Sequence, residues 1–193
     1  DRVRRHVAQG GITDVDFFPA ARADDLPPVG PGTRVLLAQP YLSDTVSALC
    51  KRGAKLVSAT YPLGVEGTLA WFQAAAAEWG VGAESVKESL AIPIARAQKS
   101  LAKARESLQD RTIHFLPDSQ LELPLARFLR DECGMSLMEV ATPYLDQTLM
   151  AEEMLRLGTG VSLVEGSHLD SALARVRHNR PDLTVCAMRT AHP

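Results

Sequence analysis

Cysteines, aromatic residues and long apolar runs are all scarce in this sequence, and each scarcity excludes a class of protein. The chain has three cysteines among 193 residues, and their wide, irregular spacing argues against a disulfide framework and for a reducing, cytoplasmic setting. Aromatic residues make up 5% of the chain and the formal net charge is −2, so a nucleic-acid groove is not expected. No apolar run reaches membrane-spanning length, and the charged start of the chain lacks the apolar stretch of a secretory signal.

Glycine is missing from the turn where a dinucleotide-binding fold would need it. Residues 112–116 form an apolar run that predicts a buried strand, and residues 120–132 have the apolar spacing of a helix that stops at Gly134. The turn between them, Pro117 to Leu121, contains no glycine. A pyrophosphate could not approach the backbone there as it does in a Rossmann dinucleotide site, so the usual nucleotide cofactor is not indicated.

Strand-type and helix-type segments alternate along the chain. The alternation predicts an α/β fold with Rossmann-like parallel sheets covered by helices on both faces. We expect two lobes, residues 1–90 and 91–193, the first incomplete and the second truncated at its end, because no initiator Met is present and the last strand feeds no helix. Strands are expected at 15–18, 34–38, 55–59, 112–116, 136–140, 161–164 and 183–188. Helices are expected at 43–51, 68–79, 84–108 (interrupted or started at Pro93), 120–132, 148–157 and 168–178.

Two strand-to-helix turns carry the polar residues that are candidates for a site. Asp118 and Ser119 follow the strand at 112–116, where parallel sheets place ligand-binding loops, although either side chain would also serve as a helix N-cap. Glu66 lies between Gly64 and Gly67, where backbone amides at a helix start could meet an anion, although an ordinary turn residue is the alternative. Neither turn has the lysine and spacing of a phosphate-binding P-loop.

The cysteines and the one strand histidine have plainer interpretations. Cys50, Cys133 and Cys186 are far apart in sequence, unlike the clustered ligands of most metal sites, so we interpret all three as structural and expect no metal ligand in this segment. His114 lies among apolar strand residues and is predicted to be a core histidine with its hydrogen bonds satisfied.

Four segments of the chain also resemble one known family in the same order. The resemblance extends from about residue 15 to residue 186, and the family is the N subunits of the light-independent (dark-operative) protochlorophyllide reductase, within the nitrogenase component 1 superfamily. The matching segments are Gln39-Pro40-Tyr41-Leu42 with Thr45, Tyr61-Pro62-Leu63-Gly64-Val65-Glu66-Gly67-Thr68 with Trp71, Pro117-Asp118-Ser119-Gln120-Leu121-Glu122 with the helix that follows, and Arg180-Pro181-Asp182-Leu183-Thr184-Val185-Cys186.

The resemblance implies a subunit of an oxidoreductase of chlorophyll and bacteriochlorophyll synthesis. Such an enzyme is a heterotetramer of N and B subunits that reduces the C17=C18 double bond of protochlorophyllide ring D. A separate ATP-hydrolysing iron–sulfur reductase, which carries the ATP and Mg, supplies electrons through a 4Fe-4S cluster. The family's cluster ligands are expected outside this segment, so none is carried over and the fragment alone is not expected to be active.

The end of the chain departs from the family pattern. Arg189 and Thr190 stand where the family has small residues after the last strand, and Arg189 is therefore a further candidate for the site. Three alternatives stay open: a chlorophyllide reductase subunit, a nitrogenase cofactor-assembly scaffold, and a non-catalytic α/β binding domain.

Overall fold

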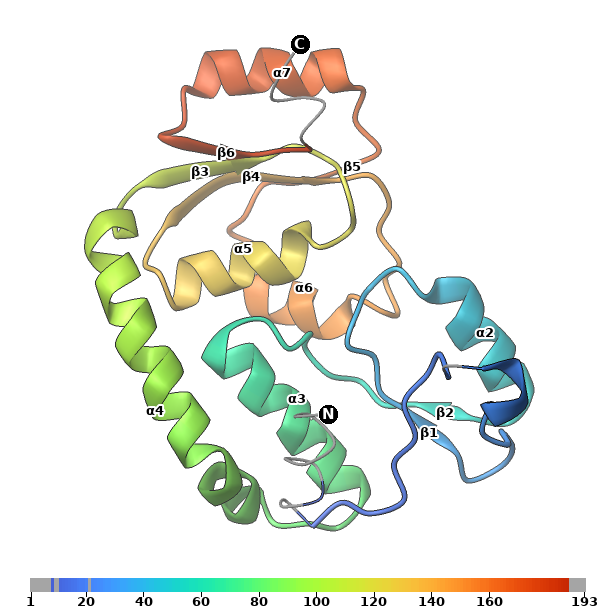
Figure 1. Cartoon of the computed structure of the whole chain (residues 1–193). Coiled ribbons are helices and arrows are strands. Elements are labelled where there is room, and N and C mark those ends of the chain that lie inside the picture. Colours follow the sequence, from blue (N-terminus) through green and yellow to red (C-terminus); the bar gives the residue numbers. More distant parts are fainter. Residues whose placement is uncertain (1–7, 9–10, 21, 188–193) are drawn as a thin grey trace.

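The computed structural model describes residues 8, 11–20 and 22–187, and it arranges their strands in two parallel sheets (Figure 1). The first sheet pairs β1 (Arg34–Val35) with β2 (Lys55–Leu56). The second sheet has the order β5-β4-β3-β6, built from β3 (Thr112–Phe115), β4 (Ser136–Thr142), β5 (Leu163–Glu165) and β6 (Leu183–Val185).

Helices connect these strands and cover both faces of the second sheet. Figure 1 shows α7 on one face of this sheet and α5 and α6 on the other, which confirms the predicted fold class. The helices are α2 (Ser43–Lys51), α3 (Gly64–Glu78), α4 (Ala83–Leu108), α5 (Glu122–Asp131), α6 (Ala151–Leu157) and α7 (Leu169–Asn179), with a 3-10 turn η1 (Ala23–Asp25) before β1. Among the described residues, no helix is both long and apolar enough to cross a membrane.

Alternation along β3 decides which face of the second sheet is apolar. Ile113 and Phe115 are buried in a cluster with Leu123 and Ala126 of α5. His114, between them in sequence, lies on the opposite face, because successive side chains of a strand point to opposite sides. The face toward α5 and α6 therefore holds the core of this half of the molecule.

A second apolar cluster joins α3 to α4. Trp71 and Phe72 of α3 meet edge to face, with ring centroids 5.1 Å apart, and they share this cluster with Val86 and Leu90 of α4. Helix α4 runs without a break through Pro93, so the expected interruption there is wrong. An interior proline costs a helix about 3 kcal/mol, and the packing of α4 on α3 offsets this cost.

Other elements also differ from the expected ranges, since α3 begins at Gly64 rather than at residue 68, α6 begins at Ala151 rather than at residue 148, and several strands differ. Residues 15–18 form no strand, since they belong to neither of the two sheets, and Phe18 is 49% exposed. The first two strands are shorter than expected, since their ladder ends where the Val57 amide donates to the Val35 carbonyl. Strand β6 ends at Val185, and Met188, where we expected its end, lies outside the described residues.

Candidate functional site

The order of strands in the second sheet marks one edge as the natural place for a site. From β3 the chain adds β4 and then β5 on one side, and it returns through α7 to place β6 on the other side of β3. Phe115 pairs with Val185, and the Leu116 amide donates to the Val185 carbonyl at 2.9 Å, so β3 and β6 end together. Open α/β sheets bind ligands outside the carboxyl ends of strands where the order reverses in this way.

We call this edge the switch point and define it by residues 117–121 and 186–187. It contains Asp118 and Ser119, as the sequence predicted for a ligand-binding loop. Arg189 follows four residues after the last residue of β6, but it lies outside the described residues.

A buried glutamate from α5 holds the turn at the switch point. The amides of Asp118 and Ser119 donate to Glu122 Oε1 at 2.8 and 2.7 Å. Helix α5 begins at Glu122 and has no side-chain cap, so the predicted N-cap role of Asp118 and Ser119 is wrong. The hydrogen bonds run the other way, because the side chain of Glu122, the first helical residue, accepts from the amides of the turn. Asp118 itself is exposed.

The second oxygen of the same carboxylate reaches the neighbouring strand. The Thr142 hydroxyl donates to Glu122 Oε2 at 3.1 Å, and Thr142 is the last residue of β4. Glu122 is 3% exposed and Thr142 is fully buried. The carboxylate therefore ties the turn after β3 to the carboxyl end of β4. Sequence reasoning missed both residues, although an acidic residue just after a polar turn was an available signal.

The start of α3 is closed in the same way by a second glutamate. Glu132 accepts from the amides of Val65 at 2.6 Å and Glu66 at 3.1 Å. The anion that the sequence predicted for this helix start is thus a carboxylate of the chain itself. Burial raises the pKa of Glu132 above its ordinary value, against the lowering effect of these two hydrogen bonds. Glu66 is exposed.

The two candidate turns do not form one site. Glu122 and Glu132 stand at opposite ends of α5, ten residues apart in sequence, which is about 15 Å along a helix. Glu66 is hydrogen bonded through its amide at the far end, whereas Asp118 and Ser119 lie at the near end. Asp118 and Ser119 therefore lie at the switch point, whereas Glu66 lies away from it.

A buried ion pair joins the middle of α5 to α6 and to the loop before α3. Arg127 Nε donates to Glu153 Oε2 at 2.6 Å, and both side chains are at most 1% exposed. The Tyr61 amide donates to Glu153 Oε1 at 2.7 Å, while Arg127 Nη2 donates to the carbonyls of Tyr61 and Leu63 at 3.1 and 3.3 Å. These contacts join α5 and α6 to the loop that follows the first sheet, and no sequence pattern predicted them.

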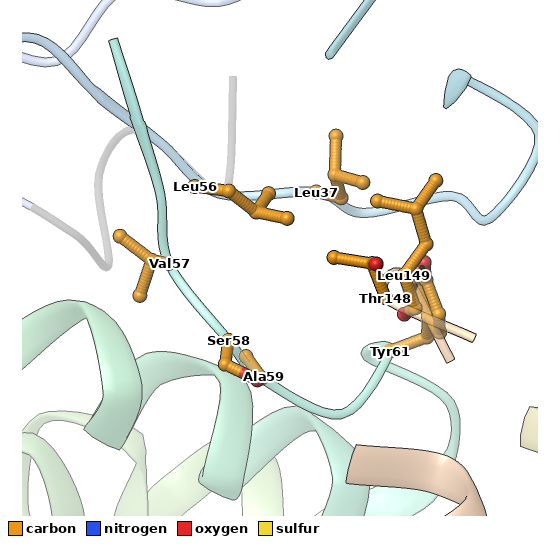
Figure 2. Close-up of a pocket in the computed structure, with 8 residues that line it drawn as sticks. All are labelled: Leu37, Leu56, Val57, Ser58, Ala59, Tyr61, Thr148 and Leu149. Atoms are coloured by element: carbon orange, nitrogen blue, oxygen red, sulfur yellow. Dashed lines mark hydrogen bonds between the residues drawn. The ribbon is translucent and has the colours of Figure 1, made fainter. Parts of the chain in front are cut away.

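A small hollow opens beside Tyr61 where the two halves meet. Figure 2 shows Leu37 and Leu56 facing it from the first sheet region, with Tyr61 and Leu149 on another side. The Tyr61 hydroxyl donates to the Leu149 carbonyl at 3.0 Å, and burial raises the pKa of Tyr61. The hollow measures about 10 Å³, close to the minimum that one water needs. It is too small for an organic cofactor.

A second polar cluster lies on the face of the sheet that α7 covers. His114 is fully buried and its Nε2 is 3.4 Å from Glu139 Oε1, while Arg175 Nε of α7 donates to both oxygens of Glu139 at 2.9 and 2.8 Å. Neither ring nitrogen of His114 has a hydrogen bond, so the predicted burial is confirmed and the predicted satisfaction is wrong. Burial lowers the pKa of His114 below its ordinary value; the Glu139 carboxylate opposes this shift and Arg175 adds to it. His114 is therefore neutral at pH 7.

The three cysteines lie in separate places. Cys50 is exposed in α2, Cys133 is buried after α5, and Cys186 is half-buried one residue beyond β6 rather than inside that strand. Burial raises the pKa of the Cys133 thiol. Within residues 8, 11–20 and 22–187, no three His, Cys, Asp or Glu side chains gather in a group that could hold a metal. The described cysteines do not fit the thiolate set of a 4Fe-4S cluster.

Comparisons with known proteins agree with the fold and with the motifs. Subunit N of light-independent protochlorophyllide reductase from Halorhodospira halophila is 53% identical over 193 residues, covering 100% of this chain and 46% of the relative. The subunit N from Synechococcus sp. strain CC9311 is 49% identical over 193 residues, covering 100% of this chain and 45% of the relative. The chain thus spans about half the length of the curated relatives it matches.

A solved structure shares the fold. The match to the structure described as Nitrogenase Cp1 at pH 6.5 covers 95% of this chain and 44% of the chain in that structure. Its TM-score is 0.62 and the sequence identity is 18%. The family model for nitrogenase component 1 type oxidoreductases matches residues 1–193. The resemblance found in the motifs is therefore confirmed, and the chain belongs to the nitrogenase component 1 type oxidoreductases.

Proposed function

We propose that this chain is part of the N subunit of a light-independent protochlorophyllide reductase. In this proposal the complete enzyme reduces the C17=C18 double bond of protochlorophyllide ring D to give chlorophyllide. The observation that carries the proposal is the 53% identity with such a subunit over all 193 residues. Membership in the oxidoreductase family supports the same reaction class.

The proposal extends to partners and cofactors. A B-type subunit completes a heterotetramer in the cytoplasm, and a separate ATP-dependent iron–sulfur reductase, holding ATP and Mg, delivers the electrons. The 4Fe-4S cluster that passes those electrons on takes its ligands from outside this segment, since the described cysteines do not fit it. We therefore assign this chain no step of electron transfer.

The contribution that we propose for this segment is a scaffold for one wall of the pigment site. The switch point places Asp118 and Ser119 at the carboxyl ends of β3 and β6, where parallel sheets bind ligands. The division into two lobes, residues 1–90 and 91–193, also stays a proposal, with α4 crossing the boundary between them.

The experiment is an assay of the full-length subunit, co-expressed anaerobically with its B-type partner. Protochlorophyllide, ATP and the iron–sulfur reductase are added, and chlorophyllide is followed by absorption while iron and pigment affinity are measured. We expect ATP-dependent product and about four irons per heterodimer, as one cubane cluster requires. Iron without pigment binding would point instead to a sister enzyme, and a folded complex with neither would point to a non-catalytic scaffold.

A pair of variants tests the place of the site. Asp118→Asn changes an exposed side chain at the switch point, and Asp170→Asn makes the same change in the first turn of α7, where Asp170 is also exposed. We expect D118N to weaken pigment binding and D170N to leave it unchanged. Equal affinities for the two variants would place the pigment elsewhere.

A further inference from the structure

Glu122 fills a position that a bound anion occupies in many parallel α/β proteins. Backbone amides in the turn between a strand and a helix commonly donate hydrogen bonds to a phosphate. Here the amides of Asp118 and Ser119 both point at Glu122 Oε1, at 2.8 and 2.7 Å. The carboxylate is 3% exposed, so the acceptor that satisfies this turn is supplied from inside the protein itself.

The turn itself needs this support. Gln120 has a φ of 71°, in the left-handed region that a residue with a side chain rarely adopts, and such a conformation persists only when its surroundings fix it. The Leu121 amide reaches Ser119 Oγ at 3.4 Å, which is too long for a strong hydrogen bond. The two short bonds to Glu122 are therefore the main local restraint on the turn.

Thr142 in turn fixes the carboxylate. Its hydroxyl donates to Glu122 Oε2 at 3.1 Å from the last residue of β4. The carboxylate thus receives three donors, from the turn after β3 and from β4. The sheet therefore sets the orientation of the Glu122 carboxylate, and the carboxylate in turn fixes the positions of the Asp118 and Ser119 amides.

We propose that Glu122 is a positioning residue for the ligand of the switch point. It holds the Asp118–Ser119 turn in the form that meets the ligand, although its buried side chain lies behind the turn. The ligand named here, protochlorophyllide, rests on the proposed function. The positioning role does not, because it can be measured in the subunit without pigment.

Glu132, the C-cap residue at the other end of α5, supplies a matched control. It also accepts two loop amides, those of Val65 and Glu66, but at the opposite end of α5. Removing either carboxylate leaves two amides without their acceptor, and E122A also leaves the Thr142 hydroxyl without Glu122 Oε2, so E132A is the control for the loss of two amide hydrogen bonds. Only the change at Glu122 touches the switch point.

The test compares Glu122→Ala, Glu122→Gln and Glu132→Ala in the full-length subunit with its B-type partner. Gln keeps an acceptor oxygen for the two amides, so E122Q should stay within about threefold of wild-type pigment affinity, while E122A should lose about tenfold or more, as expected for losing hydrogen bonds to a charged group. E132A should keep wild-type affinity. If E122A does not fold, Thr142→Val removes the hydroxyl that lies 3.1 Å from Glu122 Oε2 and 3.3 Å from the Tyr144 carbonyl oxygen, and a loss of about threefold is expected.

Hydrogen exchange of the Asp118 and Ser119 amides gives a second readout in the free subunit. Exchange should speed up about tenfold in E122A, less in T142V, and not at all in E132A. Equal losses of affinity in E122A and E132A, or unchanged exchange in E122A, would overturn the positioning role. A wild-type complex that ignores the pigment would overturn the proposed function, and hydrogen exchange alone would then decide the role of Glu122.

Discussion

Replacing Gly67 with alanine tests how firmly Arg127 is held. A Cβ added at Gly67 would lie 2.4 Å from Arg127 Nη2 and 2.7 Å from the Tyr61 carbonyl oxygen, so one of them must move. The guanidinium cannot retreat without leaving Glu153 and the carbonyl of Tyr61. Disrupting a buried ion pair costs about 3–5 kcal/mol.

Alanine also favours the helical state, and this gain opposes the cost. Gly67 lies inside α3, where alanine is better than glycine by about 1 kcal/mol. The expected net loss for G67A is therefore about 2–4 kcal/mol of unfolding free energy. Urea denaturation of the full-length subunit, followed by tryptophan fluorescence, would measure it, because Trp71 is buried in the same helix.

Gly160→Ala is the matched control. An added Cβ at Gly160 meets nothing within 4 Å and the residue does not have a left-handed φ, so G160A should change stability by less than about 0.5 kcal/mol. A G67A protein as stable as wild type, or more stable, would show that helix propensity outweighs the contact and would refute a fixed Arg127.

Three further predictions concern other buried groups. Arg127→Met should cost about 3–5 kcal/mol by urea denaturation, and adding Glu153→Met should recover part of that loss, because the unpaired charge is then gone. The lowered pKa of His114 means that the unfolded chain binds its proton more readily, so stability should fall as the pH drops below about 6.5. His114→Gln should flatten that dependence in thermal melts recorded from pH 7.5 to 5, and an unchanged slope would contradict it. Iodoacetamide should label exposed Cys50 in the native protein but buried Cys133 only after unfolding, as peptide mass spectrometry would show.

The sequence was sufficient for the fold because its signals are local. Helix α2 was predicted at its observed residues, Ser43–Lys51, although the capping by Ser43 and Asp44 that was expected there is wrong, because the helix has no side-chain cap and Leu42 precedes it. The run at 15–18 shows the limit of such signals, since a strand forms only where the fold places it beside a sheet, and this run belongs to neither sheet.

The site was only partly predictable because its contacts are long-range. Asp118 and Ser119 were identified from their place after a strand, a local property. The ties of Glu122 to Thr142 and of Glu132 to Val65 join residues 20 and 67 positions apart. No periodicity or motif predicts which distant group will donate a hydrogen bond to a buried carboxylate. The roles of Glu122 and Glu132 were therefore found only in the structure.

The anchoring of α5 along its whole length has a mechanical consequence. Its first residue is tied to the turn after β3, its middle to α6 and the loop before α3, and its end to the first turn of α3. A short helix resists bending because packed interiors transmit strain rather than absorb it. A displacement of the turn at one end of α5 is therefore expected to reach the first turn of α3 through Glu132, which bonds the Val65 and Glu66 amides.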